Sequence, residues 1–216
     1  RDADLLGFGA SDLESVAQVF REIAAVAVDD GIVFDPASVT VEEIRKEAGY
    51  GGVRVVIAGE LAKARCKTQI DVGFGDAVTP GPVDSVYPVL LDDLPAPRLR
   101  AYPTYTVIAE KLHAIALLGM TNSRLKDYFD LSVLLEREIL DADLLAQAIK
   151  ATFERRGMTV PAELPVGLTD EFAHDASRQV LWQSFVKKNE LDPEPLAAIV
   201  GRLRLALEPA LNRAAR

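Results

Sequence analysis

The chain has 216 residues, of which 49% are hydrophobic and 26% charged, and its formal net charge is −9 at pH 7. This composition predicts a folded protein with a hydrophobic core, and it excludes a disordered tail, a collagen-like repeat and a disulfide scaffold. No apolar run reaches the roughly 18 residues of a membrane-spanning helix, and the single cysteine, Cys66, fits a cytoplasmic protein. The acidic balance argues against broad, non-specific binding of nucleic acid, but it leaves room for RNA held by a local basic patch.

The first hundred residues predict an α/β portion. A short strand over residues 1–6 leads to a helix that Ser11 can cap and whose apolar residues recur at a spacing of three to four. Runs rich in β-branched residues predict further strands over 32–34, 39–41, 53–61 and 66–74. The last two runs can form a hairpin, and the preceding Tyr50-Gly51-Gly52 is expected to be a turn.

The second half of the chain predicts helices. A proline-rich connector follows Asp76 and suits a linker or a wrap rather than long helices. From residue 105 onward, helical patterns cover 106–118, 123–137, 142–155, 176–188 and 195–213. We therefore expect an α+β protein with an α/β part over 1–104 and an all-helical part over 105–216.

Two carboxylates in the first strand form a candidate metal site. Residues two apart in a strand project from the same face, so Asp2 and Asp4 lie side by side, about 6–7 Å apart along the strand. Such a pair suits a hard divalent cation such as Mg²⁺. The alternative is a solvated, acidic strand edge.

Asp71 is an acid in the middle of the strand predicted over 66–74. Its face also carries Lys67 and two glycines, whereas the opposite face is apolar. If this strand neighbours that of Asp2 and Asp4, three carboxylates converge and could hold one or two metal ions and activate an attacking hydroxyl. The alternative is that Asp71 pairs with Lys67 across an exposed sheet face.

Lys111 interrupts an apolar stripe of the helix over 106–118. It aligns with Val107 and Leu118, so it must extend to solvent, pair with an acid or meet an anionic ligand. His113 on the same helix is expected to be an ordinary surface or interface histidine rather than a base.

The first turns of the helix over 123–137 combine two cations and two acids. The spacings predict the ion pairs Arg124–Asp127 and Lys126–Asp130. The functional alternative is that both cations contact phosphates beside a helix N-terminus, which favours anions. Asp127 would then orient Lys111 or a substrate hydroxyl.

Three stretches together resemble the AbiEii family of nucleotidyltransferase-like toxins of type IV toxin–antitoxin and phage-abortive systems, which includes the mycobacterial MenT group. The stretches are RDADLLG at 1–7, YTVIAEKLHA at 105–114 and LGMTNSRLKDYFDL at 118–131, of which the last is the most specific. The resemblance runs to about residue 135 and continues more loosely through the helical part.

The resemblance implies a polymerase-β-like nucleotidyltransferase sheet domain followed by an all-helical domain. Asp2 and Asp4 match the family's metal-binding acid pair, and Asp71 stands where this superfamily usually keeps its third carboxylate. Lys111 matches the lysine that faces the nucleotide and Asp127 the acid near it. The remaining residues of the same motif are implied in nucleotide binding: Arg124, Lys126 and Asp130.

The resemblance also implies reactants and partners. Similar toxins use an NTP and Mg²⁺, and some add pyrimidine nucleotides to the tRNA 3′ end. The usual partner is an antitoxin with a winged-helix DNA-binding domain. The family also places a Gly-Gly or Gly-Ser motif ahead of the acid pair, so we expect the native start to lie upstream of Arg1.

Two alternatives remain open at the level of sequence. One is a non-catalytic protein that keeps the fold and acts by binding an antitoxin or another protein. The other is a kinase-like transfer of phosphate onto a partner protein from the same site.

Overall fold

The computed structural model describes residues 2–45, 51–89, 91 and 93–216. The chain forms two compact units, the first comprising Arg1–Asp76 and Val89–Pro95 and the second Ala77–Pro88 and Ala96–Arg216. The proline-rich connector therefore contributes to both units. The division into domains over 1–104 and 105–216 stays a prediction.

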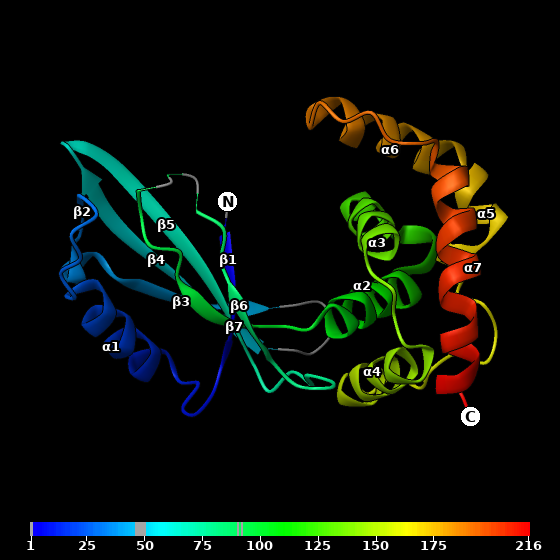
Figure 1. The fold of residues 1–216 in the computed structure, drawn as a ribbon, viewed down its shortest axis with the longest axis horizontal. Helices are drawn as coiled ribbons and strands as arrows, with labels where there is room; N and C mark the ends of the chain where they lie inside the picture. Colours follow the sequence, from blue (N-terminus) through cyan, green and yellow to red (C-terminus); the bar gives the residue numbers. More distant parts are fainter. Residues whose placement is uncertain (1, 46–50, 90, 92) are drawn as a thin grey trace. The chain divides into compact units, whose positions relative to one another are not determined.

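A mixed sheet is the frame of the first unit (Figure 1). Its strands are β1 (Asp2–Gly7), β2 (Ile32–Phe34), β3 (Thr40–Arg45), β4 (Gly51–Leu61) and β5 (Ala64–Phe74). The order is β1-β5-β4-β2, with β3 also paired to β4. β1 runs parallel to β5, and the other pairs are antiparallel. The strand next to β1 is thus the one that carries Asp71.

The β4–β5 hairpin is confirmed, although both strands begin two residues earlier than predicted. Leu61 pairs with Ala64 across a two-residue turn, in which Ala62 and Lys63 both have positive φ values of 48° and 73°. Two positive φ values in succession are typical of the tight turns whose twist matches that of the strands. Gly51 and Gly52, expected in a turn, belong to β4, and Tyr50 lies outside the described residues.

Helix α1 (Leu13–Ala24) packs on one face of this sheet. Val16 and Phe20 are buried against apolar strand residues that include Val55 and Val72. The N-cap is Asp12, whose carboxylate accepts a hydrogen bond from the backbone N–H of Ser15, rather than the predicted Ser11. Since side chains alternate along a strand, the opposite face of the sheet holds the polar residues.

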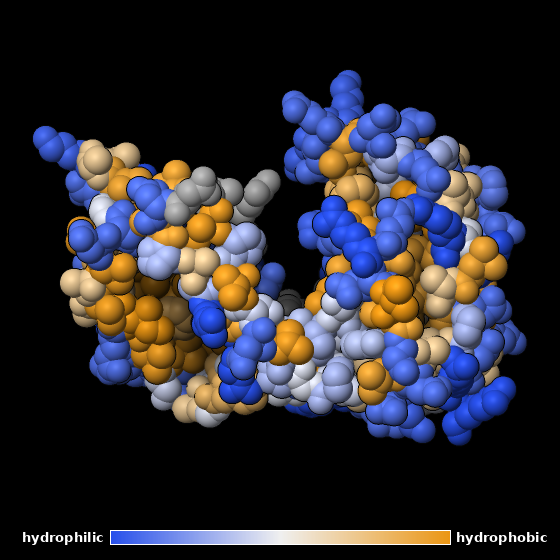
Figure 2. Space-filling view, viewed as in Figure 1, coloured by the Kyte–Doolittle hydropathy of each residue, from blue (hydrophilic) through white to orange (hydrophobic). Residues whose placement is uncertain are grey.

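Hydrophobic side chains also gather on the outer surface over α1 (Figure 2). Ile23 and Val19 on this helix are 55% and 52% exposed. The helix ends at Ala24.

The second unit starts with a small antiparallel ribbon of β6 (Val83–Val86) and β7 (Arg98–Ala101), which the sequence did not predict. Its helices are α2 (Thr104–Leu118), α3 (Leu125–Arg137), α4 (Ala142–Arg155), α5 (Asp170–His174), α6 (Ala176–Lys188) and α7 (Leu196–Ala214). Short 3₁₀ turns in this unit cover Gly119–Thr121 and Val166–Leu168, and one in the first unit covers Pro36–Ser38. Each helix predicted in this unit is present with ends within two residues, whereas α5 was not predicted.

The second unit has a hydrophobic core of its own, built mainly by α2, α3, α4 and α7. Fully buried side chains such as Leu112, Tyr128 and Phe153 meet there. The α+β class, with a sheet unit followed by helices, is confirmed. No helix among the described residues is both long and apolar enough to cross a membrane.

Candidate functional site

A row of charged side chains crosses the polar face of the sheet in the first unit. Asp4 on β1 is the direct register partner of Asp71 on β5, and Asp71 is the partner of Arg54 on β4. The row continues to Glu42 on β3. Partners in register project from the same face, and the other face packs on α1, so these side chains share the face away from α1. The predicted neighbourhood of Asp4 and Asp71 is therefore present.

Arg54 holds Asp71 with two hydrogen bonds. Its Nε and Nη2 each donate to one carboxylate oxygen of Asp71, both at 2.8 Å. This two-point pairing fixes the plane of the carboxylate. The predicted alternative, a pair between Asp71 and Lys67, is wrong, because Arg54 takes that place.

Arg54 is a candidate site residue that sequence reasoning missed. The only signal was the one cation of a run that is mostly apolar and rich in β-branched residues. Identifying its partner requires the register of the hairpin, which depends on a turn closed by Ala62 and Lys63 without any glycine.

The chemistry of this row fits a hard divalent cation. Asp4 is exposed, and carboxylate oxygens such as those of Asp4 and Asp71 are the ligands that hard divalent cations prefer. The positive charge of Arg54 also offsets the repulsion between the two neighbouring acids. No cluster of three potential metal ligands occurs among the residues described. The side chain of Asp2 lies outside the described part, so the convergence of three carboxylates stays a prediction.

Gly73 keeps the polar face open next to Asp71, as the sequence suggested. A Cβ atom built at this glycine would lie 3.4 Å from an oxygen of Asp76. The group that lies near Gly73 is thus the carboxylate of Asp76, two residues beyond the end of β5.

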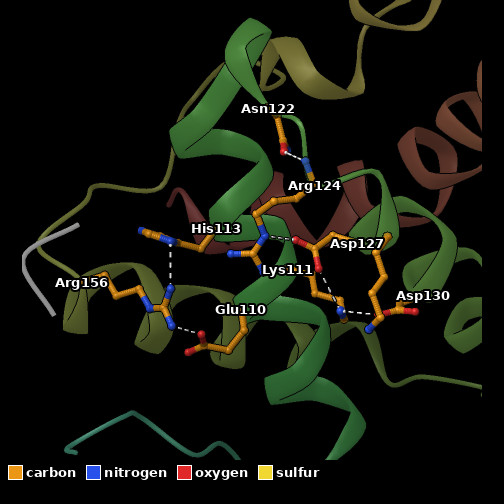
Figure 3. A network of polar contacts seen from close by, with 9 residues as sticks. Glu110, Lys111, His113, Asn122, Arg124, Asp127, Asp130 and Arg156 are labelled. Carbon is orange, nitrogen blue, oxygen red and sulfur yellow. Dashed lines mark hydrogen bonds and ion pairs between the residues drawn. The ribbon is translucent and has the colours of Figure 1, made fainter. Parts of the chain in front are cut away.

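In the second unit, Lys111 on α2 is the centre of an ion-pair network (Figure 3). Its Nζ donates to Asp127 Oδ1 at 3.0 Å and to Asp130 Oδ2 at 2.7 Å. The Asp127 side chain is only 4% exposed and that of Lys111 16%. The lysine therefore pairs with acids, as one of its sequence alternatives proposed, and it ties α2 to α3.

The network determines the charge states of its members. Burial alone would lower the pKa of Lys111, but the hydrogen bonds and charges of Asp130 and Asp127 outweigh this effect, so the pKa is raised. Burial would raise the pKa of Asp130, yet Lys111 and Lys126 reverse the effect and lower it. Lys111 is thus cationic and Asp130 anionic at neutral pH.

Two exposed cations complete the network at the start of α3. Arg124 Nε lies 2.7 Å from Asp127 Oδ2, and Lys126 Nζ donates to Asp130 at 2.8 Å. Both predicted ion pairs are confirmed. The side chains of Arg124 and Lys126 remain 58% and 72% exposed, so they are accessible to an anionic ligand.

A buried amide sets the start of α3. The side-chain oxygen Oδ1 of Asn122 accepts a hydrogen bond from the backbone N–H of Arg124 at 2.8 Å. The backbone carbonyl oxygen of Asn122 accepts a second one from the guanidinium of Arg178. The helix therefore begins at Leu125, two residues later than predicted. Asn122 holds the segment that carries the cations.

His113 is buried rather than at a surface, which corrects the prediction. Only 1% of it is exposed, and its ring packs edge-on against Phe153 with centroids 5.0 Å apart. Burial lowers its pKa, so it is neutral at pH 7. On the same helix, Glu110 forms an ion pair with Arg156. The expectation that His113 is not a catalytic base agrees with this burial.

The candidate residues thus fall into two groups, each within one unit. Asp4 and Asp71 lie together in the first unit, where Arg54 joins them. The other group, in the second unit, consists of Lys111, Arg124, Lys126, Asp127 and Asp130. Their catalytic and nucleotide-binding roles stay predictions.

Comparison with known proteins gives the family. A solved crystal structure described as a candidate nucleotidyltransferase from H. pylori aligns with 99% of this chain and 79% of its own, at 15% sequence identity and a TM-score of 0.49. No curated protein matches significantly. The sequence model of the family described as "Nucleotidyl transferase AbiEii toxin, Type IV TA system" matches residues 1–213. The chain therefore belongs to the AbiEii family of nucleotidyltransferase toxins of type IV toxin–antitoxin systems.

Proposed function

We propose that this toxin is an Mg²⁺-dependent enzyme that transfers a nucleoside monophosphate from an NTP to an RNA acceptor, such as the 3′ end of a tRNA. The acceptor hydroxyl attacks the α-phosphorus, a new phosphodiester bond forms, and pyrophosphate leaves. Family membership supports the reaction class. The observation that carries the assignment to residues is the register pair of Asp4 and Asp71, with Arg54 holding the second acid.

The acids of the first unit are assigned to the metal. Asp2 and Asp4, with Asp71, would hold Mg²⁺, which when bound neutralises phosphate charge and lowers the barrier to displacement. Asp71 would also accept the proton of the acceptor hydroxyl, for which its orientation by Arg54 is suited.

The cations of the second unit are assigned to the nucleotide. Lys111, together with Arg124, would neutralise charge on the triphosphate and on the departing pyrophosphate. Asp127 and Asp130 would orient Lys111, which their hydrogen bonds support. Lys126 is the most exposed of these cations and would contact phosphate from the edge of the network.

The first experiment combines the protein with Mg²⁺, total tRNA and each labelled NTP in turn. Label should enter tRNA with at least one NTP and should be absent with Asp4→Asn. The identity of the labelled NTP then names the transferred nucleotide. Omission of Mg²⁺ in the same assay tests the metal requirement, and label in RNA without any divalent cation would contradict it.

A second candidate function is binding without catalysis. It is favoured by Lys111, whose charge is already shared between two acids. The type IV toxin–antitoxin family implies an antitoxin partner. We propose that this partner carries a winged-helix domain and meets the toxin in the cytoplasm.

The same assay separates the alternatives. Absence of label with every NTP, from folded protein that still binds its antitoxin, would favour the non-catalytic function. A gain in the mass of a partner protein by one phosphoryl group after incubation with ATP, rather than by a whole nucleotide, would instead indicate kinase-like transfer.

A further inference from the structure

A basic stripe leads along β5 towards the candidate acids. Every second residue of this part of β5 is polar, and side chains at that spacing share one face of the sheet. The residues are Arg65, Lys67, Gln69 and Asp71. That face is the one opposite α1, on which Asp71 stands beside Asp4. The stripe therefore continues directly into the row of acids.

The two cations of this stripe are open to an external anion. Arg65 and Lys67 are both exposed, and neither forms an ion pair with any residue that the structure describes. Glu60 is the register partner of Arg65 on β4 but does not form an ion pair with it.

The other cations of the candidate site differ in this respect. Arg54 is held by Asp71, and Lys111 is held by Asp127 and Asp130. Unpaired cations on the surface of a chain with a net charge of −9 are more available to an external anion than these. The repeat of cations along an extended strand, about 6.6–6.8 Å for two residues, suits a ligand with repeated phosphates better than a single compact anion.

We propose that Arg65 and Lys67 bind successive phosphates of the acceptor RNA and guide its end along β5 towards Asp71. This inference rests on the proposed function, because it assigns the acceptor to the face that carries the acids. Phosphate contacts of this kind position a strand without reading its sequence. The stripe is local, which reconciles RNA binding with an acidic protein.

The test replaces both cations by neutral residues of similar length, Arg65→Gln/Lys67→Gln. The probe is a labelled single-stranded oligoribonucleotide of about 12 nucleotides, and its affinity is measured by fluorescence anisotropy at several salt concentrations. The slope of log K against log salt is negative, and loss of two phosphate contacts should make it shallower by about 1.4. Binding at 0.1 M salt should weaken by roughly ten- to thirtyfold.

Lys187→Gln/Lys188→Gln is the matched control. These two lysines are exposed at the end of α6, form no ion pair with a described residue, and change the net charge by the same amount. The control should bind the RNA like the wild type. Equal weakening of both variants would show an effect of net charge alone and would overturn the proposal, as would unchanged binding by the stripe variant.

Two further arms separate this inference from the proposed function. Asp4→Asn should lose nucleotide transfer but still bind the RNA, because it does not alter the stripe. The affinity of the stripe variant for the NTP alone should not change, and a loss there would assign the stripe to the triphosphate instead. If the wild type transfers nucleotide and the stripe variant binds the RNA as tightly as the wild type, the proposed function stands and only this inference is removed.

Cys66 allows a direct measurement of position. It is the single cysteine of the chain, it is exposed, and it lies between Arg65 and Lys67 on the opposite face of the strand. Since the thiol projects from the face opposite the stripe, a short photo-crosslinker on it should not attach to the oligoribonucleotide. An efficient crosslink that unlabelled RNA suppresses would place the RNA on the other face of the sheet and would contradict the assigned path.

Discussion

The sheet of the first unit and the helices of the second hold charge in different ways. On the sheet, Asp4 is exposed and Asp71 is held by the guanidinium of Arg54, whose side chain is 32% exposed. Between α2 and α3, Lys111 is largely buried and is bonded to two acids at once. The first arrangement leaves carboxylate oxygens accessible to a ligand, whereas the second also joins two helices.

This difference predicts which properties each residue controls. Removal of an exposed acid leaves no buried charge without a partner, so folding is little affected. Removal of one member of a buried ion pair leaves its partner desolvated and uncompensated, which is strongly destabilising. Activity and stability should therefore change separately for the exposed Asp4 of the first unit and together for Lys111 of the second.

Asp4→Asn should have the largest effect, and on activity alone. Loss of a metal-binding carboxylate removes several kcal/mol of transition-state stabilisation, so we expect nucleotide transfer to fall by about 10³-fold. Since Asp4 is exposed, the urea midpoint should stay close to that of the wild type. Transfer assays and urea unfolding of the same preparation check both expectations, and a collapse of stability would show that the acid is structural.

Lys111→Met should lower activity and stability together. It leaves Asp127, which is 4% exposed, without its lysine partner, and we expect the free energy of unfolding to fall by about 3 kcal/mol. Combining it with Asp127→Leu should recover part of this loss, because no buried charge then remains unpaired. Urea denaturation of the two variants measures the difference. If Lys111→Met is inactive but as stable as the wild type, the second unit would resemble the first in separating activity from stability, and the contrast would fail.

Arg54→Gln should have an intermediate effect. Asp71 loses both hydrogen bonds from the guanidinium, so its carboxylate is no longer oriented, and we expect a loss of about 1 kcal/mol in stability and of roughly tenfold in transfer. Arg54→Lys keeps the charge without the two-point geometry, so its stability and transfer activity should lie between those of the wild type and of Arg54→Gln. Full activity in Arg54→Gln would show that the orientation of Asp71 is not required.

Asp130→Asn should change the pH dependence of folding. Lys111 and Lys126 outweigh burial and hold the pKa of Asp130 below its ordinary value of 3.8, so its contribution to stability is present above about pH 4 and is lost as the pH falls through the lowered pKa. The variant should be less stable than the wild type at neutral pH, and the gap should narrow in acid. Urea unfolding between pH 3 and 7 measures the gap, and a constant gap would contradict this origin.

The sequence alone determined most of the elements and the local ion pairs. Strand alternation placed Asp71 opposite the apolar face of its strand, and the helix spacing predicted the pairs Arg124–Asp127 and Lys126–Asp130, both of which are present. These patterns depend on residues within one strand or one helical turn. The family also followed from short stretches of sequence, which the match over residues 1–213 confirms.

Only the tertiary structure decided the partners between elements. Arg54 rather than Lys67 holds Asp71 because the strand register places it directly opposite, and Lys111 meets Asp127 and Asp130 because α2 packs on α3. His113 is buried because the same helix turns that side towards Phe153. Contacts between residues distant in sequence depend on how elements pack, and periodicity within one element carries no information about the neighbour it meets.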